Sequence, residues 1–376
     1  MQRVKQRLSS IAVGTCAALL SLAAQAQSSS SSLTLYGTVD TFVQTARGDG
    51  SLSRVQSGGL SGSRLGFRGT EDLGSGLSAI YTLEAGINTD DGSSGQGGIL
   101  FGRQLFVGLK SDLGQVTLGR QYSSIYPATT DFSAFSNNIA GPSTAVIGGF
   151  AGGYEPVRGA SATANSPAAG ATGNGGPARV NNSLRYESPS FAGLRAGVLY
   201  GFGEVADATN DQRLIDLFVR YTAGPVDAIV SQVNDRTQGI DPTNVATSTV
   251  ATAVAFGNAH VFAGFMNVND CRAANLDGRG YWLGGDYRIA NHLLRAQYVV
   301  NDPRSGNDDQ TRAFGVGYQY DFTRRTAFYS SITRFDNQPN AGVGGLGRWN
   351  AAVPTGLTST SSNDITELVA GLRHTF

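Results

Sequence analysis

The stretch Phe314-Gly315-Val316-Gly317-Tyr318-Gln319-Tyr320-Asp321-Phe322 decides the fold. Its large apolar and aromatic residues occupy every second position, and glycine, glutamine and aspartate stand between them. Successive side chains of a β-strand point to opposite faces of the sheet. The pattern therefore predicts a strand with one apolar face and one small or polar face.

The same alternation recurs in 194–202, 215–221 and 365–376, whereas helical periodicity is weak everywhere after residue 32. Together with the turn residues, it predicts sixteen strands joined by connections that alternate between short and long. The expected long connections include 47–60 and 124–178. The expected strands are 33–46, 61–73, 77–89, 99–112, 115–123, 179–189, 193–206, 211–222, 226–237, 248–256, 259–270, 278–289, 293–303, 309–321, 326–337 and 363–376.

The composition excludes several other classes of protein. Glycine supplies 51 of 376 residues, and charged residues are only 15% of the chain. A sequence that is 40% hydrophobic and 9% aromatic is too apolar to be disordered. After Gln27 there is no run of 18 apolar residues, so no transmembrane helix is expected. Three histidines and two cysteines leave little material for a metal cluster or a disulfide framework.

Residues 1–26 have the pattern of a secretory signal peptide. Three basic residues precede an apolar stretch, and the segment ends in Ala24-Gln25-Ala26, a small-x-small cleavage pattern. A lipoprotein anchored through Cys16 is a weaker interpretation, because the apolar run continues past that residue. Cleavage would leave residues 27–376, in which Lys110 is the only lysine and all other cationic side chains are arginines.

Strands of ten to fourteen residues are long enough to cross a bilayer at a tilt. Backbone groups in lipid must all be paired, so such a sheet has to close on itself. An even number of strands, with short turns at one end and long loops at the other, is the plan of an outer-membrane barrel. A secreted sandwich or propeller would show shorter strands and no gathering of aromatic residues near the strand ends, as at Tyr320 and Phe322.

Several motifs carry a resemblance to a known family. In this order and spacing, the chain resembles the trimeric general porins of Gram-negative outer membranes, of the β-proteobacterial type, over essentially all of residues 27–376. The motifs are Tyr36-Gly37 with Asp40, Ser63 to Gly69 with Glu71 to Gly74, Phe101 to Gln104, Val107 to Leu109, Leu118 to Tyr122, Asn182 to Tyr186, Ser188 to Leu194, and Gly371 to Phe376.

The resemblance implies an all-β fold, a 16-stranded antiparallel transmembrane β-barrel whose long third loop folds into the lumen. It implies a water-filled channel for passive diffusion of ions and small hydrophilic solutes, with no catalysis, no cofactor, no metal and no nucleic-acid partner. The expected partners are two further copies in a homotrimer, outer-membrane lipid and lipopolysaccharide, and the barrel-insertion machinery. In the resembling family, that machinery reads a C-terminal aromatic residue, here Phe376.

The expected constriction loop is the segment at about 124–178, since a stretch this long without strand pattern is usually functional. Its few charges nominate Asp131, and then Glu155, for the acidic side of the constriction. Both residues could instead be solvated acids of an external loop.

The opposite side of the constriction is expected to be basic. Strand parity turns Arg64 and Arg68 inward, and the resemblance places constriction arginines at Arg64, Arg103 and Arg179. The family often has a lysine where this chain has Thr38, which weakens any anion preference. The other residues expected to face the lumen are Thr38, Asp40, Thr82, Glu84, Arg185, Glu367 and Arg373.

Arg120 has the parity of Val116 and Leu118, the expected outer face. A lipid-facing charge is costly, and the resemblance suggests an intersubunit contact, with Asp90 or Asp91 of a neighbour. An arginine just beyond the membrane is the simpler alternative.

Three other functions compete with a general diffusion channel. An enzyme on a barrel needs a catalytic constellation at the rim, but His260 and His292 lie beside the expected short turns. An adhesive or structural barrel would have a plugged lumen. A substrate-specific channel differs only in its constriction, which the sequence does not reveal.

Overall fold

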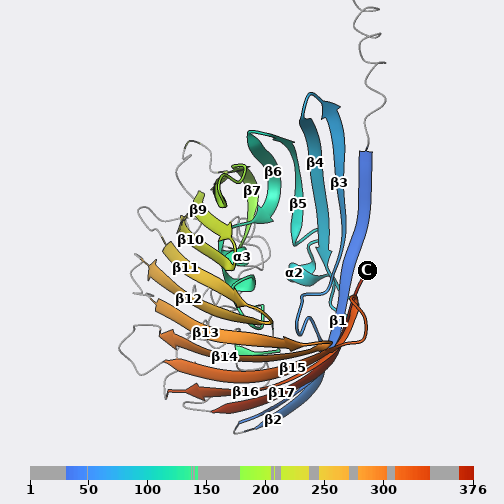
Figure 1. Cartoon of the computed structure of the whole chain (residues 1–376), viewed down its shortest axis with the longest axis vertical. Coiled ribbons are helices and arrows are strands. Elements are labelled where there is room, and N and C mark those ends of the chain that lie inside the picture. The colour runs from blue at the N-terminus through green and yellow to red at the C-terminus, as the bar shows by residue number, and fades with distance from the viewer. Residues whose placement is uncertain are drawn as a thin grey trace, which may run out of the picture.

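The computed structural model describes residues 31–48, 50–136, 138, 140–142, 178–204, 207, 213–236, 245–270, 278–302, 310–338 and 364–376. Within these ranges the chain forms one antiparallel sheet whose strands follow one another around a curved wall (Figure 1). No helix of this described part is long and apolar enough to cross a membrane.

β1 pairs with both β2 and β3, each later strand pairs with the next in the sequence, and β17 pairs with β1, so the sheet closes as a barrel. The strands are β1 (Ser31–Arg47), β2 (Ser51–Ser57), β3 (Arg64–Gly74), β4 (Leu77–Gly86), β5 (Gln104–Ser111), β6 (Gly114–Tyr122), β7 (Arg179–Glu187), β8 (Leu194–Gly201), β9 (Leu214–Ala223), β10 (Val226–Asp235), β11 (Val245–Phe256), β12 (Ala259–Asp270), β13 (Gly278–Ile289), β14 (His292–Asp302), β15 (Thr311–Asp321), β16 (Thr326–Asn337) and β17 (Ile365–Thr375).

β2 and β3 share one strand position of the barrel. β2 pairs with residues 41–47 of β1, and β3 pairs with residues 31–38 of the same strand. The barrel therefore has sixteen strand positions, as expected. The expectation of a loop over 47–60 is wrong, because residues 51–57 of that segment form β2 against β1.

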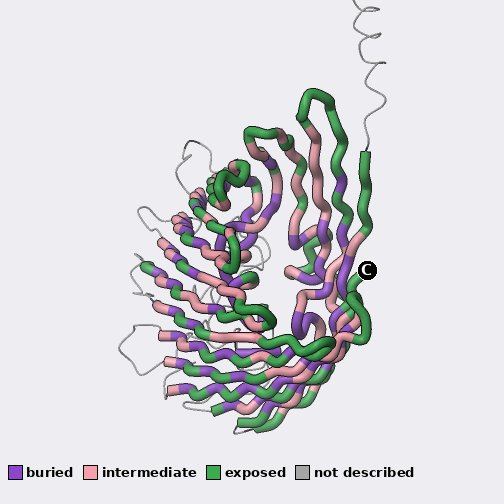
Figure 2. Tube along the Cα trace, viewed as in Figure 1, coloured by how far each residue is buried: buried purple, intermediate pink, exposed green. Residues whose placement is uncertain are grey.

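Buried and exposed residues alternate along most strands, as the tube in Figure 2 shows. In β15, Phe314 and Val316 are exposed on the outer face, whereas Ala313 and Gln319 are buried on the inner face. The period-two pattern thus separates an apolar outer surface from a lumen. Val180 departs from the alternation of the rest of β7 and is buried in the inner apolar cluster, beside the irregular register at Gly119/Gln121 and a positive φ of 48° at Asn182.

The barrel closes where the chain ends. The backbones of Gly37 and Phe376 exchange two hydrogen bonds of 3.1 Å, and the Phe376 ring covers Gly37. A Cβ at residue 37 would lie 2.4 Å from that ring, so only glycine fits beneath it. The expected short connections are all present at one end, as between β3 and β4 at Ser75-Gly76 and between β9 and β10 at Gly224-Pro225.

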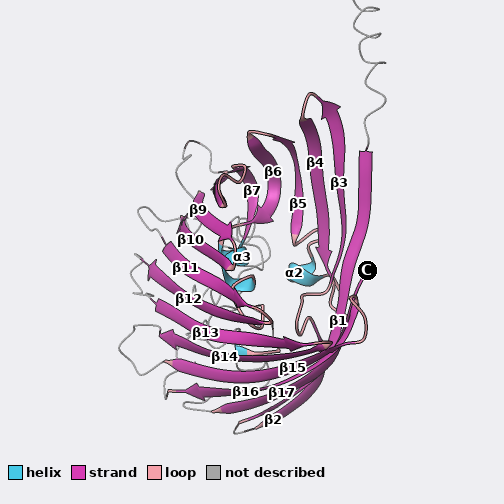
Figure 3. Cartoon of the chain, viewed as in Figure 1, coloured by secondary structure: helices cyan, strands magenta, loops and turns pink. Residues whose placement is uncertain are grey.

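A segment after β6 runs inside the barrel. It begins with α3 (Ile125–Thr130), which lies within the curve of the wall and contacts β10 and β11 (Figure 3). Ile125 and Phe132 are fully buried in a cluster with inward apolar side chains of β9 to β17. We call this inward run, residues 123–136, 138 and 140–142, the internal segment.

Candidate functional site

Glu84 is the centre of a charged cluster on the inner wall. The residue is 5% exposed, and its carboxylate lies 2.8 Å from Nε of Arg103 and 3.8 Å from Nε of Arg64. Tyr36 donates a hydrogen bond of 2.9 Å to its second oxygen, and Tyr122 donates one of 3.1 Å to the first. Four side chains from β1, β3, β6 and the segment before β5 thus converge on one acid.

Arg103 is held on several sides at the end of the connection that contains α2 (Gly95–Gly98). Its backbone N–H donates to the carbonyl of Glu84 at 3.1 Å, and its Nη2 donates to the Tyr126 hydroxyl at 3.1 Å. The side chain is almost fully buried. A charge-assisted pair fixed in this way gives an arginine of defined position rather than a mobile one.

Arg179 joins the cluster through two tyrosine rings. Tyr122 and Tyr126 stack with their ring centroids 3.8 Å apart, and the Arg179 guanidinium lies 5.3 Å and 5.5 Å from those centroids. These distances are typical of cation–π contacts. The structure therefore brings together three of the four predicted basic residues: Arg64, Arg103 and Arg179.

Arg68 lies apart from this cluster, four residues further along β3. Its guanidinium lies 5.1 Å from the centroid of the Tyr36 ring, and its side chain is exposed on the inner face. Among the described residues it pairs with no carboxylate, whereas Arg64 and Arg103 share Glu84.

Asp131 does not face the Glu84 cluster. Its carboxylate pairs with Arg220 at 2.7 Å, and Arg220 also pairs with Asp227 at 2.6 Å. Among the described residues, the acid that contacts Arg64 and Arg103 is Glu84 of the wall. Glu155, the second nominated acid, lies outside the described residues.

The internal segment is fastened to the wall by contacts that the sequence did not reveal. Asp216 accepts hydrogen bonds from the backbone N–H of Ser124, at 2.6 Å, and from its hydroxyl. Further along, Trp282 donates from Nε1 to the carbonyl of Phe132 at 2.8 Å. The alternation of 215–221 places Asp216 on the inner face, so the sequence indicated the direction of this side chain but not its partner.

The remaining predicted lumen residues all lie on the inner face, in different roles. Asp40 is fully buried and accepts N–H bonds from Gly59, Leu60 and Ser61, so its carboxylate anchors the link between β2 and β3. Glu367 is buried beside Gln44. The other four that share this inner face are Thr38, Thr82, Arg185 and Arg373.

Arg120 is not exposed to the outside, contrary to its parity. It is 8% exposed, donates from Nε to the carbonyl of Gly102 at 2.8 Å, and donates from Nη1 to Asn181. The chain itself covers the side chain next to an irregular register at Gly119/Gln121. Asp90 and Asp91 remain exposed, and hydrogen bonds from the hydroxyl and N–H of Ser93 lower the pKa of Asp91.

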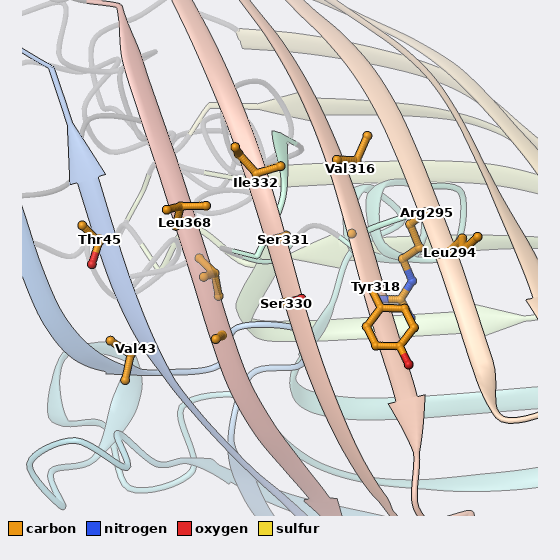
Figure 4. Close-up of a pocket in the computed structure, with 13 residues that line it drawn as sticks. Val43, Thr45, Leu294, Arg295, Val316, Tyr318, Ser330, Ser331, Ile332 and Leu368 are labelled. Carbon is orange, nitrogen blue, oxygen red and sulfur yellow. The ribbon is translucent and has the colours of Figure 1, made fainter.

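A hollow of about 750 Å³ lies in the outer surface rather than in the lumen. It spans β1 and β14 to β17 and is lined chiefly by exposed apolar side chains, among them Val43, Leu294, Val316, Ile332 and Leu368 (Figure 4). These residues face lipid or a neighbour. The hollow therefore takes no part in conduction.

A closed barrel with an apolar outside, charged side chains inside and a segment folded inward has the architecture of a porin. Residues 12–340 match the family described as Gram-negative porin. The chain belongs to this family. It is an outer-membrane channel of a Gram-negative bacterium, and the family's members are channels rather than enzymes.

Individual relatives agree with this family. The chain is 30% identical over 367 residues to outer membrane porin protein 32 of Delftia acidovorans, and the match covers 94% of this chain and 96% of that protein. It is 29% identical over 377 residues to an outer membrane porin protein of Bordetella pertussis, with 84% and 91% covered. Among solved structures, the anion-selective porin from Comamonas acidovorans matches with a TM-score of 0.73 at 27% identity, covering 92% of this chain and all of that one.

Proposed function

We propose that this porin is a general diffusion channel with a weak anion preference, set where Arg64, Arg103 and Arg179 gather around Glu84. The carrying observation is the charge balance of that cluster: it holds three arginines and one carboxylate, which pairs with Arg64 and Arg103, while Arg179 lies over the Tyr122 and Tyr126 rings. Charged side chains at a narrow point of a pore filter ions by sign, so an excess of positive charge favours anions. Arginine retains its charge even when close to other cations.

Two further observations support the proposal. A solved structure similar to this chain is that of an anion-selective porin. The position where the family often has a lysine is Thr38, which lies on the inner face without a charge. We therefore expect a weaker anion preference than three unpaired arginines would produce.

The test is the reversal potential of the purified protein in planar bilayers across a salt gradient. The double variant Arg64→Ala, Arg103→Ala should move the reversal potential toward cation selectivity. Arg334→Ala is the matched control, because Arg334 is an exposed arginine on the outer side of β16 and pairs with Asp336 and Asp364. An unchanged reversal potential in the double variant, with folding intact by circular dichroism, would refute the assignment. A plugged barrel would give no conductance at all.

We propose that Arg68 adds to the basic side, and that Asp131, with Glu155, adds to the acidic side of the same lumen. Support for Asp131 is its position in the internal segment, where its side chain is 43% exposed beside Arg220. Residues 1–26 are proposed to be removed as a signal peptide before the barrel is inserted. The insertion machinery is proposed to read Phe376.

The channel is proposed to act as a homotrimer surrounded by lipid and lipopolysaccharide. Porins are typically trimeric, and a trimer form is among the similar structures. Asp90 and Asp91 are exposed and could contact a neighbouring subunit. Arg120 already has hydrogen-bond partners within its own chain, so we propose that it holds the segment around Gly102 in place. An Arg120→Ala trimer that resists heat and detergent as the wild type does would argue against any role at the interface.

A further inference from the structure

We infer that a second, polar hollow is a binding site for small oxyanions such as inorganic phosphate. It lies on the inner wall, between the Glu84 cluster and the short turns. The inference rests on the proposed function, because the anion has to enter the lumen. The hollow adjoins the cluster around Glu84, because the Tyr36 ring contacts Arg68 and the Tyr36 hydroxyl donates to Glu84. It lies on the first strands of the barrel, toward the short turns.

The hollow has a volume of about 210 Å³. A water molecule takes up about 30 Å³ of liquid, so this space could hold about seven waters or a small oxyanion with part of its hydration shell. The side chains that line it from the inner face come from four neighbouring strands. They include Ser32, Thr34, Arg68, Thr70, Thr82 and Phe106.

Arg68 supplies the charge of this site. Its guanidinium lies against the Tyr36 ring and, among the described residues, has no carboxylate partner. The planar fork of donors is therefore oriented but not neutralised. Such a fork matches two oxygens of a carboxylate or phosphate at once.

Hydroxyl groups complete the site around Arg68. Ser32 and Thr34 on β1, Thr70 on β3 and Thr82 on β4 can each donate a hydrogen bond to an anionic oxygen. The registers place Arg68 opposite Thr34 on one side and opposite Thr82 on the other. One guanidinium between hydroxyls suits a tetrahedral or carboxylate anion better than chloride, because only the former presents several acceptor oxygens.

The site stands in series with the constriction. Arg68 follows Arg64 by four residues on a strand that rises by about 3.4 Å per residue and is tilted by about 40° to the barrel axis, so it lies roughly 10 Å further along the pore. Glu84 neutralises part of the charge of Arg64, but the described acids leave Arg68 unpaired. An anion that passes the constriction would meet a second, uncompensated cation, held weakly enough to leave again.

The experiment measures single-channel chloride current of the full trimeric protein while inorganic phosphate is added at constant ionic strength, to one side and then the other. We expect phosphate to reduce the current in a saturable way, more effectively from the side of the short turns. Arg68→Gln should raise the half-inhibitory phosphate concentration about tenfold or more, since it removes a charge-assisted hydrogen bond. Arg68→Lys, which keeps the charge without the fork, should fall between the two.

Two further variants sharpen the result. Thr70→Val with Thr82→Val should raise the half-inhibitory concentration by about fivefold, because it removes neutral hydrogen bonds. Arg195→Gln is the matched control, since Arg195 is an inward arginine of β8 that pairs with Glu187, and phosphate sensitivity should persist in it. Two results would overturn this inference alone: a wild-type channel that conducts but is not inhibited by phosphate, or Arg68 variants that are inhibited as strongly as the wild type. A wild-type protein that forms no conducting channel would overturn the proposed function as well.

Discussion

The two halves of the barrel wall use their inward side chains differently. On β9 to β16, buried apolar side chains such as Phe218, Met266 and Trp282 belong to the cluster that includes the internal segment, and polar residues such as Gln297 and Thr333 lie among them. On β1 and β3 to β7 the inward side chains are polar or charged and gather around Glu84. We call these halves the packed wall and the open wall.

The difference separates two tasks within one sheet. The packed wall holds the internal segment in place, so substitutions there should change stability and the shape of the pore. The open wall carries the charged cluster around Glu84, so substitutions there should change ion selectivity. Removing one partner of its buried ion pairs should also lower stability, because the other charge is left uncompensated.

Removing Trp282 should produce the largest effect. Trp282 is 3% exposed, and its Nε1 is bonded to the Phe132 carbonyl. Trp282→Ala should lower the free energy of unfolding by about 3 to 5 kcal/mol, because it opens a cavity and leaves that carbonyl unpaired. Thermal unfolding in detergent measures this loss. Tyr281→Ala, at the neighbouring outward position, is the control and should cost less.

Asp216 should rank next, since it fastens the start of the internal segment. Asp216→Ala removes both hydrogen bonds from Ser124 and should cost about 2 to 3 kcal/mol. We expect lower thermal stability together with noisier single-channel current as the segment loosens. Ser124→Ala removes only the hydroxyl bond and should cost about half as much. If the effects of the two single variants simply added in the double variant, the two side chains would not be coupled as described.

Much of this fold could be predicted from the sequence, because period-two alternation assigns each side chain to a face. The expected bounds of β12, β13 and β16 agree with the structure residue for residue. β2 was not predicted because its small residues Ser51, Ser53 and Ser57 resemble a loop, and it is stabilised by pairing with β1. The irregular register at Gly119/Gln121, with positive φ at Gly119 and Asn182, places Val180 inward, and period-two alternation does not predict such a shift.

The site was less predictable than the fold. Parity places Arg64 and Glu84 on the inner face, but it does not say which side chains meet across a curved wall. The pairing of Arg103 with Glu84 depends on the path of the connection through α2, and the pairing of Asp131 with Arg220 depends on where the internal segment lies. Both paths are set by tertiary packing.

Glu84 tests the open wall. Glu84→Gln leaves Arg64 and Arg103 without their carboxylate, so the preference for anions over cations should rise by about threefold to tenfold. The reversal potential in a salt gradient reports this change. Glu71→Gln, an exposed acid on the outer face of β3, should leave the reversal potential as it is. A large loss of thermal stability in Glu84→Gln without any change in selectivity would contradict the division into two walls.

Asp131 should produce the smallest effect, because it is exposed on the internal segment and its only described ion pair is with Arg220 of β9. Its side chain is 43% exposed, and its partner Arg220 keeps a second acid, Asp227, when Asp131 is neutralised. Exposed ion pairs contribute about 0 to 1 kcal/mol, so Asp131→Asn should barely change thermal unfolding and should shift selectivity by less than about twofold. Arg220→Gln should do more, since it leaves both acids without a partner. If Asp131→Asn instead shifted selectivity as strongly as Glu84→Gln, the acidic side of the constriction would lie on the internal segment rather than on the open wall.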